Sequence, residues 1–199
     1  MPLPLRTARL IIRPLAADDA NDVFAVYGDP VVLQFWNSDP LDDPSEAEEW
    51  AAAQGALHAS RGFAQWHVSE TAAGRFVGCL GLQPLQDEVE ILYALVPGAW
   101  GRGYATEAAL AALEYGLSEI GLERVVGIAR EANAASLRVL QKLGMRSLGL
   151  AVYWGTRWAK YELTAAGWRV ARSSSTTDKL MRSASLRGAA HRHDDRRRG

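Results

Sequence analysis

Residues 97–108 read PGAWGRGYATEA and lie where the pattern of the chain changes from strand to helix. The preceding residues 89–96, VEILYALV, are almost entirely apolar and predict a buried strand. Good helix formers follow from residue 104, with apolar residues three and four positions apart. Gly101 and Gly103 stand between the two patterns, so either the backbone turns sharply there or a ligand comes very close to it.

Three interpretations of these glycines are open. A tight turn is the simplest, because glycine tolerates positive φ. The spacing of Gly101, Gly103 and Thr106, with Glu123 further on, nearly fits a dinucleotide fingerprint, but that fingerprint belongs to a mainly parallel sheet. A Walker loop is excluded because no Gly-Lys-Ser/Thr follows. In the third interpretation, unpaired N–H groups of residues 101–106 bind a pyrophosphate at a helix start, and Arg102 adds positive charge at the rim.

The pattern around this loop predicts an α+β domain with a mixed sheet. Three apolar strands joined by short turns precede the loop and predict an antiparallel meander. A strand over residues 123–130 follows the helix and must run parallel to residues 89–96, because a helix crosses between them. The three meander strands are expected over residues 63–70, 75–82 and 89–96. Further strands are expected over residues 5–13, 145–154 and 157–164, and helices over about 18–28, 44–60, 104–120 and 134–143.

Composition limits the class of protein. The chain has 199 residues and a net charge of −1, which suits one domain with a real core. No apolar run is long enough to span a bilayer and no secretion signal is present, so we expect no membrane association and a cytoplasmic location. The single cysteine, Cys79, lies in an apolar run and is expected to be a small buried residue. No metal-ligand spacing exists, and no metal is expected.

The two ends of the chain differ in charge. Residues 1–170 carry a net charge of −6, whereas residues 171–199 carry +5 and are rich in serine and arginine. We therefore expect a folded domain over residues 1–170 and a disordered basic tail over 171–199. Arg192 and residues 196–198 of the tail suit contact with ribosomal RNA, although a solvated extension or an artefact explains them more simply.

The loop resembles the acetyl-CoA loop of the GNAT superfamily of N-acetyltransferases, whose pattern is Gln/Arg-x-x-Gly-x-Gly/Ala. The matching residues are Trp100-Gly101-Arg102-Gly103-Tyr104-Ala105. Residues 7–15, 133–136 and 142–145 are similar to the RimJ/RimL-type branch, which is associated with acetylation of ribosomal-protein N-termini. Trp100 departs from the pattern, but a site built from backbone N–H groups does not depend on that side chain.

The resemblance implies a GNAT-like, mostly antiparallel sheet of about seven strands flanked by about four helices. It implies a splayed pair of parallel strands that forms a cleft for acetyl-CoA, the co-substrate. The backbone of Tyr93, Ala94 and Leu95 is then expected to pair with the pantetheine arm. The diphosphate is expected on Gly101, Arg102, Gly103, Tyr104, Ala105 and Thr106. Asn133 is expected to contact the arm from the opposite wall, and it is also a natural N-cap.

Catalysis in this family is direct attack of an amine on the acetyl group. Glu90 is the candidate base because it shares strand parity with Leu92 and Ala94, although it equally suits a charged strand start. The leaving thiolate needs a hydrogen bond. Some relatives use a tyrosine at the position of Leu140, so Ser136 is the substitute here, although a serine in a first helical turn is as ordinary. Tyr153 and Tyr161 are weaker alternatives that suit sheet packing.

The acceptor site is expected near Phe35 and Trp36, an aromatic pair in a turn-rich loop. Asp39, Asp42 or Asp43 could attract a cationic amine; a packed lid with solvated acids is the alternative. The expected acceptor is a protein N-terminal α-amine, and small amines such as polyamines, antibiotics or amino acids remain open. A CoA-binding sensor without turnover is the other class considered. The oligomeric state, monomer or homodimer, is left open.

Overall fold

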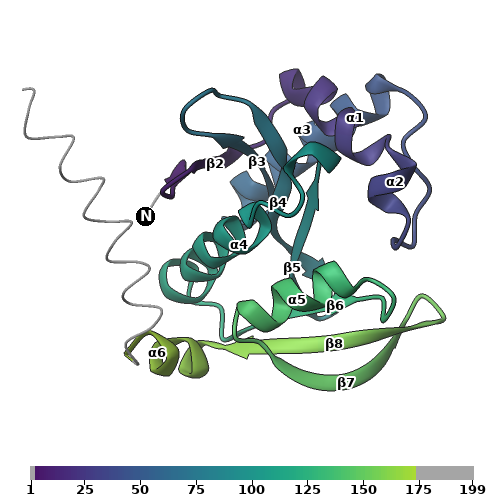
Figure 1. Ribbon diagram of the computed structural model, residues 1–199. Helices are drawn as coiled ribbons and strands as arrows, with labels where there is room; N and C mark the ends of the chain where they lie inside the picture. Colours follow the sequence, from purple (N-terminus) through teal and green to yellow (C-terminus); the bar gives the residue numbers. More distant parts are fainter. Residues whose placement is uncertain (1–2, 174–199) are drawn as a thin grey trace, which may run out of the picture.

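The structure, a computed structural model, describes residues 3–173. One sheet of eight strands runs through it in the order β1-β2-β3-β4-β5-β6-β8-β7, as Figure 1 shows. All neighbouring strands are antiparallel except β5 and β6. The strands are β1 Leu5–Arg6, β2 Leu10–Pro14, β3 Gln65–Glu70, β4 Phe76–Leu85, β5 Glu88–Leu95, β6 Arg124–Ala129, β7 Arg146–Tyr153 and β8 Thr156–Thr164.

The described residues contain six α-helices, against the four expected from sequence. They are α1 Ala20–Tyr27, α2 Pro30–Leu33, α3 Pro44–Arg61, α4 Tyr104–Glu114, α5 Ala134–Lys142 and α6 Ala165–Ser173. The four expected helices correspond to α1, α3, α4 and α5. The prediction for residues 104–120 was too simple, since α4 passes into a π-helical turn at Tyr115–Ile120 before Gly121 ends it at φ +83°. The mixed α+β fold predicted from sequence is confirmed.

The N-terminal strand predicted over residues 5–13 is wrong in detail. The chain turns back after Arg6 and forms a hairpin of β1 and β2. Thr7 and Arg9 in that turn both bind the carboxylate of Glu107 in α4, at 2.6 Å each. The turn is therefore fixed by a partner about a hundred residues away, which a local pattern does not reveal.

The central meander β3–β4–β5 sorts its side chains onto two faces. Leu80 and Ile91 pack with Ala108 and Leu113 of α4, whereas Cys79 and Ala94 pack with Val23 and Ala51 of α1 and α3. Glu90 shares the parity of Ala94 and so faces the α1 side, while Tyr93 shares the parity of Ile91 and faces the α4 side. Cys79 is completely buried, as expected, and burial raises the pKa of its thiol.

The parallel strands β5 and β6 part soon after they meet. Their pairing is a single register pair, Glu90 opposite Val126. Beyond this pair the cleft-side edge of β5 faces a cavity rather than a neighbouring strand. In Figure 1 the two strands run in clearly different directions, with α5 lying over the divergence. Glu90 thus sits where the cleft begins.

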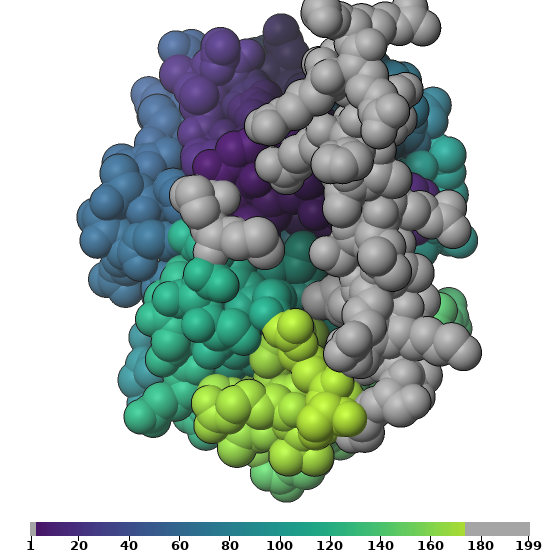
Figure 2. All heavy atoms as spheres, turned by 90° about the vertical axis from the view of Figure 1, so that its left-hand side faces the viewer, coloured from purple at the N-terminus to yellow at the C-terminus, as the bar shows by residue number. Residues whose placement is uncertain are grey.

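The C-terminal hairpin β7–β8 is followed by α6, which docks beside the end of α4 (Figure 2). The indole N–H of Trp168 donates to Glu114 at 2.7 Å, and Arg172 pairs with the same carboxylate. Helix α6 therefore extends past residue 170, where the sequence suggested that a tail begins. The predicted disordered tail and its predicted contact with RNA lie outside the described residues. None of the helices in residues 3–173 combines the length and the apolar composition that a membrane span requires.

Candidate active site

One cavity of about 630 Å³ opens at the divergence of β5 and β6. The glycine loop and the start of α4 line one end of it, and α5 lines a wall. The loop after α2 and the tip of the β7–β8 hairpin line the other end. Segments between residues 31 and 158 therefore contribute to one space, large enough for a cofactor-sized ligand.

The glycine loop offers its backbone to this cavity. Gly101 and Gly103 have φ of +72° and +80°, a conformation that side chains rarely adopt. A Cβ at Gly101 would meet no atom within 4 Å, so close packing does not explain the glycine. Gly103 is the N-cap of α4 and brings no side chain to cap the first turn. The first-turn N–H groups, up to Thr106, are left for an anion.

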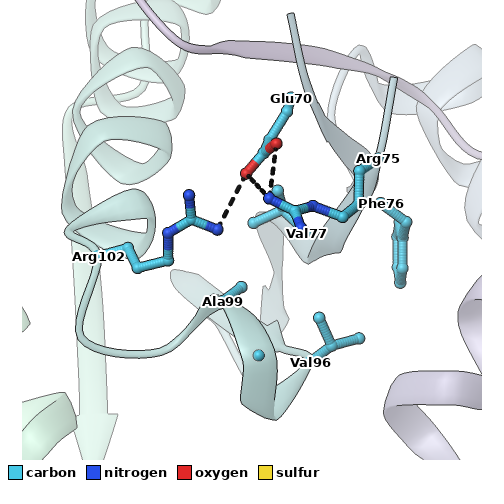
Figure 3. Close-up of a pocket in the computed structure, with 8 residues that line it drawn as sticks. Glu70, Arg75, Phe76, Val77, Val96, Ala99 and Arg102 are labelled. Atoms are coloured by element: carbon cyan, nitrogen blue, oxygen red, sulfur yellow. Dashed lines mark hydrogen bonds and ion pairs between the residues drawn. The ribbon is translucent and has the colours of Figure 1, made fainter. Parts of the chain in front are cut away.

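Arg102 behaves differently from its glycine neighbours. Its guanidinium lies 3.1 Å from the carboxylate of Glu70, which also binds Arg75 (Figure 3). The same carboxylate accepts a hydrogen bond from Tyr104. The Arg102 side chain faces the small pocket beside Glu70, and it is absent from the lining of the 630 Å³ cavity. The positive charge of Arg102, which the sequence analysis placed at the rim of the diphosphate site, is instead paired with Glu70. Glu70 therefore anchors the glycine loop from its outer side.

Trp100, the residue that departs from the expected motif, has a structural role. Its indole N–H donates to the carbonyl oxygen of Leu95 at 2.7 Å and ties the loop to the end of β5. Tyr93, Ala94 and Leu95 line the cavity with the strand edge that β6 has left. This edge carries backbone groups suited to pairing with an extended ligand arm.

Glu90 is the buried acid of the cavity. Its side chain is 2% exposed, and burial raises the pKa of its carboxyl from 4.5 to about 7. Gln83, directly opposite on β4, donates to Glu90 at 2.6 Å and opposes this rise. Gln83 in turn accepts from Gln65 at 2.8 Å, and Gln65 accepts from the hydroxyl of Tyr27.

This row of side chains runs from α1 through β3 and β4 to Glu90. In each of its three hydrogen bonds the donor is the residue farther from Glu90 and the acceptor is the residue nearer to it. The last donor is the NH₂ group of Gln83, which cannot accept a proton from Glu90. The row therefore holds Glu90 in place and favours its ionised form. Sequence reasoning missed Gln83 and Gln65, because their alignment depends on the register between strands.

Asn133 and Ser136 lie on the opposite wall, at the start of α5. The Asn133 carboxamide oxygen accepts from the backbone N–H of Ser136 at 3.0 Å, so the predicted N-cap is confirmed. The Ser136 hydroxyl lies 2.9 Å from the hydroxyl of Tyr93, which also donates to the Ser136 carbonyl at 3.2 Å. Burial raises the pKa of Tyr93 to about 12, so this phenol remains protonated. The sequence analysis singled out only the backbone of Tyr93 and not its hydroxyl.

The two hydroxyls and Glu90 approach the cavity from different faces of β5. Tyr93 and Ser136 come from the face covered by α4 and α5, and Glu90 comes from the α1 face. A group placed at the divergence of β5 and β6 would thus have a carboxylate on one side and hydroxyls on the other.

The far end of the cavity is aromatic. Phe35 and Trp36 line it, both half-buried, and the Trp36 ring packs edge-on against Tyr27 at 5.6 Å. Trp154 and Trp158 line the hairpin side and were not singled out from sequence. The acids considered for attracting a cation do not line the cavity, and Asp43 instead caps α3 through the N–H groups of Ser45 and Glu46. Tyr153 packs in the sheet and donates to Glu88.

Comparison with known proteins agrees with this geometry. Residues 9–146 match the family model described as an acetyltransferase (GNAT) domain, and the chain belongs to that family. The uncharacterized protein YkkB of Bacillus subtilis (strain 168) is 31% identical over 163 residues, covering 79% of this chain and 94% of YkkB.

Solved structures show the same fold. An acetyltransferase from Agrobacterium tumefaciens str. C58 is 27% identical, covers 82% of this chain and 95% of its own, and has a TM-score of 0.71. The ribosomal-protein-S5-alanine acetyltransferase from Vibrio fischeri is 16% identical, covers 80% and 94%, and has a TM-score of 0.69. The protein is thus an acyl-CoA-dependent N-acetyltransferase, which uses acetyl-CoA as co-substrate.

Proposed function

We propose that this enzyme acetylates an α-amine, most simply that of a protein N-terminus, with Glu90 as the general base. One observation carries the proposal: a buried carboxylate with a pKa of about 7 lies where β5 and β6 part. The RimJ/RimL-like motifs of residues 7–15, 133–136 and 142–145 support a ribosomal-type N-terminus. The fold shared with the Vibrio fischeri enzyme is compatible with it.

Transfer of a proton to Glu90 costs less from an α-amine than from an alkylamine, because the α-ammonium group is the stronger acid. An α-ammonium group has a pKa near 8, about one unit above Glu90, so the proton transfer costs about 1.4 kcal/mol. A lysine-like ammonium, near 10.4, would cost more than about 4 kcal/mol for the same step. A base of this strength is therefore matched to N-termini and other α-amines.

The reaction divides between the two faces of β5. Acetyl-CoA, when bound, supplies the acetyl thioester. The amine nitrogen forms a bond to the acetyl carbon while the carbon–sulfur bond breaks, and the amine proton passes to Glu90, directly or through water. Ser136 donates a hydrogen bond to the departing sulfur. Tyr93 supports it when its phenol donates to the Ser136 hydroxyl, because the serine hydrogen is then free to point at the sulfur.

The diphosphate is held by backbone N–H groups of Gly101, Gly103, Tyr104, Ala105 and Thr106, with Arg102 contributing its N–H rather than its charge. The edge of Tyr93 to Leu95 and the free side of Asn133 hold the arm. Phe35 and Trp36 form part of the acceptor site. These residues all line the one cavity except Arg102.

The test is release of free thiol from acetyl-CoA with peptides that have a free or a blocked N-terminus, beside spermidine and lysine-side-chain analogues. We expect turnover with free N-termini and none with blocked ones. Turnover only with the alkylamines would overturn the α-amine proposal and favour a small-molecule acceptor.

Gln83 is proposed as a positioning residue for Glu90. In Gln83→Leu the carboxylate loses its hydrogen-bond donor, so the pKa of Glu90 should rise further and the pH midpoint of kcat should move up by about one unit. Gln65→Leu, one step further along the row, is the matched control. We expect it to cost stability without an equal shift in midpoint, whereas equal midpoints in Gln83→Leu and wild type would contradict the role.

A further inference from the structure

Trp154 occupies an unusual place at the tip of the β7–β8 hairpin. It has a φ of +49° and precedes Gly155 at +73°. Two-residue hairpin turns with this backbone favour Asn-Gly, because bulky residues are strained at positive φ. The Trp154 side chain is also 58% exposed. Neither turn geometry nor burial accounts for a tryptophan here.

The place of Trp154 in the molecule suggests a use. It lines the same cavity as Glu90, and its ring packs against Tyr153 and Trp158 at 5.8 and 5.7 Å. The other apolar side chains exposed near it, Leu150 and Val152 of β7, do not line this cavity. Trp154 is therefore the member of the exposed hairpin surface that faces the reaction site.

The surroundings of Trp154 leave its ring free for a ligand. The neighbouring Trp158 is buried, and the guanidinium of Arg130 already lies 4.5 Å from its ring centre. Tyr153 and Trp158 are the aromatic rings that pack against Trp154 among the described residues, and 58% of Trp154 remains exposed. Phe35 and Trp36 line the cavity from the loop after α2, so aromatic surfaces from two distant segments border one space.

We propose that the acceptor carries an aromatic or bulky apolar group beside its amine, and that Trp154 binds this group together with Phe35 and Trp36. The inference rests on the proposed function and narrows its acceptor class. Aromatic side chains bind such groups through large apolar contact area and edge or offset ring packing. Glu90 faces the amine, and the aromatic end of the cavity receives the neighbouring group.

The experiment compares phenylalaninamide with alaninamide, two α-amines that differ only by a phenyl ring. We expect kcat/KM of the wild-type enzyme to favour phenylalaninamide by about tenfold. In Trp154→Asn the ratio should fall toward one, while the melting temperature holds or rises, because asparagine tolerates the left-handed turn. Val152→Thr, an exposed change on the same hairpin outside the cavity, should keep the wild-type ratio.

The outcomes separate the inference from the proposed function. A wild-type ratio near one, or an unchanged ratio in Trp154→Asn, overturns the inference while α-amine acetylation stands. The inference is also overturned if Trp154→Asn changes only the oligomeric state in size-exclusion chromatography, since Trp154 would then serve contact with a second copy. If neither amide nor any peptide with a free N-terminus is acetylated although acetyl-CoA binds, the proposed α-amine function itself fails.

Discussion

Glu90→Gln is expected to lower kcat by about a hundredfold or more, because the amine loses the group that takes its proton. In the wild type, activity should rise with pH through about 7, where Glu90 ionises. The variant should lack that limb and keep only the dependence that comes from the amine itself, near pH 8 for an α-amine. The measurement is thiol release at saturating acetyl-CoA between about pH 5.5 and about pH 9. This range extends about 1.5 pH units below and about 2 units above the expected midpoint of Glu90.

The same variant should be more stable than the wild type at high pH. Burial raises the pKa of Glu90 in the folded state, so its contribution to stability is present below about pH 4.5 and is lost as the pH rises through about 7. A shift from 4.5 to about 7 corresponds to a cost of about 3 kcal/mol above that window. Denaturant unfolding should show Glu90→Gln gaining over wild type at pH 8 and gaining little at pH 4.

Two kinetic results would contradict this account of Glu90. One is a kcat for Glu90→Gln within about twofold of wild type at pH 8, which would remove the base. The other is a wild-type pH profile without a limb near 7. Equal stability of the two proteins at pH 8 would show that the carboxylate carries no burial cost.

Gly101→Val is expected to weaken acetyl-CoA binding by about a hundredfold. A β-branched residue is strained at a φ of +72°, and its side chain would stand in front of the N–H groups that receive the diphosphate. Strain of this kind costs about 1–3 kcal/mol, and loss of the anion contacts adds to it. Isothermal titration calorimetry with acetyl-CoA measures the change.

Gly144→Val is the matched control for strain. Gly144 follows α5 at a φ of +74°, has no atom within 4 Å of an added Cβ, and does not line the cavity. The Gly144→Val variant should lose as much stability as the Gly101→Val variant but keep the wild-type affinity for acetyl-CoA. Equal loss of affinity in the two variants would mean that general destabilisation, and not the loop, explains the result.

Local patterns predicted the parts of this molecule that depend on local physics. The glycines before a helix, the period change at residue 104 and the Asn133 cap are all set within a few residues. The crossover helix then required β5 and β6 to be parallel. From these features the α+β sheet could be predicted, whereas the splayed cleft was implied only by the resemblance to the GNAT superfamily.

The rest depends on partners that are distant in sequence. The N-terminal turn is held by Glu107, and the Arg102 guanidinium is held by Glu70. The alignment of Gln83 with Glu90 follows from strand register, which sequence spacing leaves undetermined across the turn. Trp154 sits beside the cavity only because the hairpin tip reaches back toward the loop after α2. Such contacts are visible only in the folded chain.

A crystal structure with bound CoA tests the central claim most directly. The account predicts the diphosphate on the backbone N–H groups of residues 101–106, the arm along Tyr93 to Leu95, and the sulfur between Glu90 and Ser136. A diphosphate bound at Arg75 and Arg102 beside Glu70, or a sulfur directed away from the divergence of β5 and β6, would contradict it.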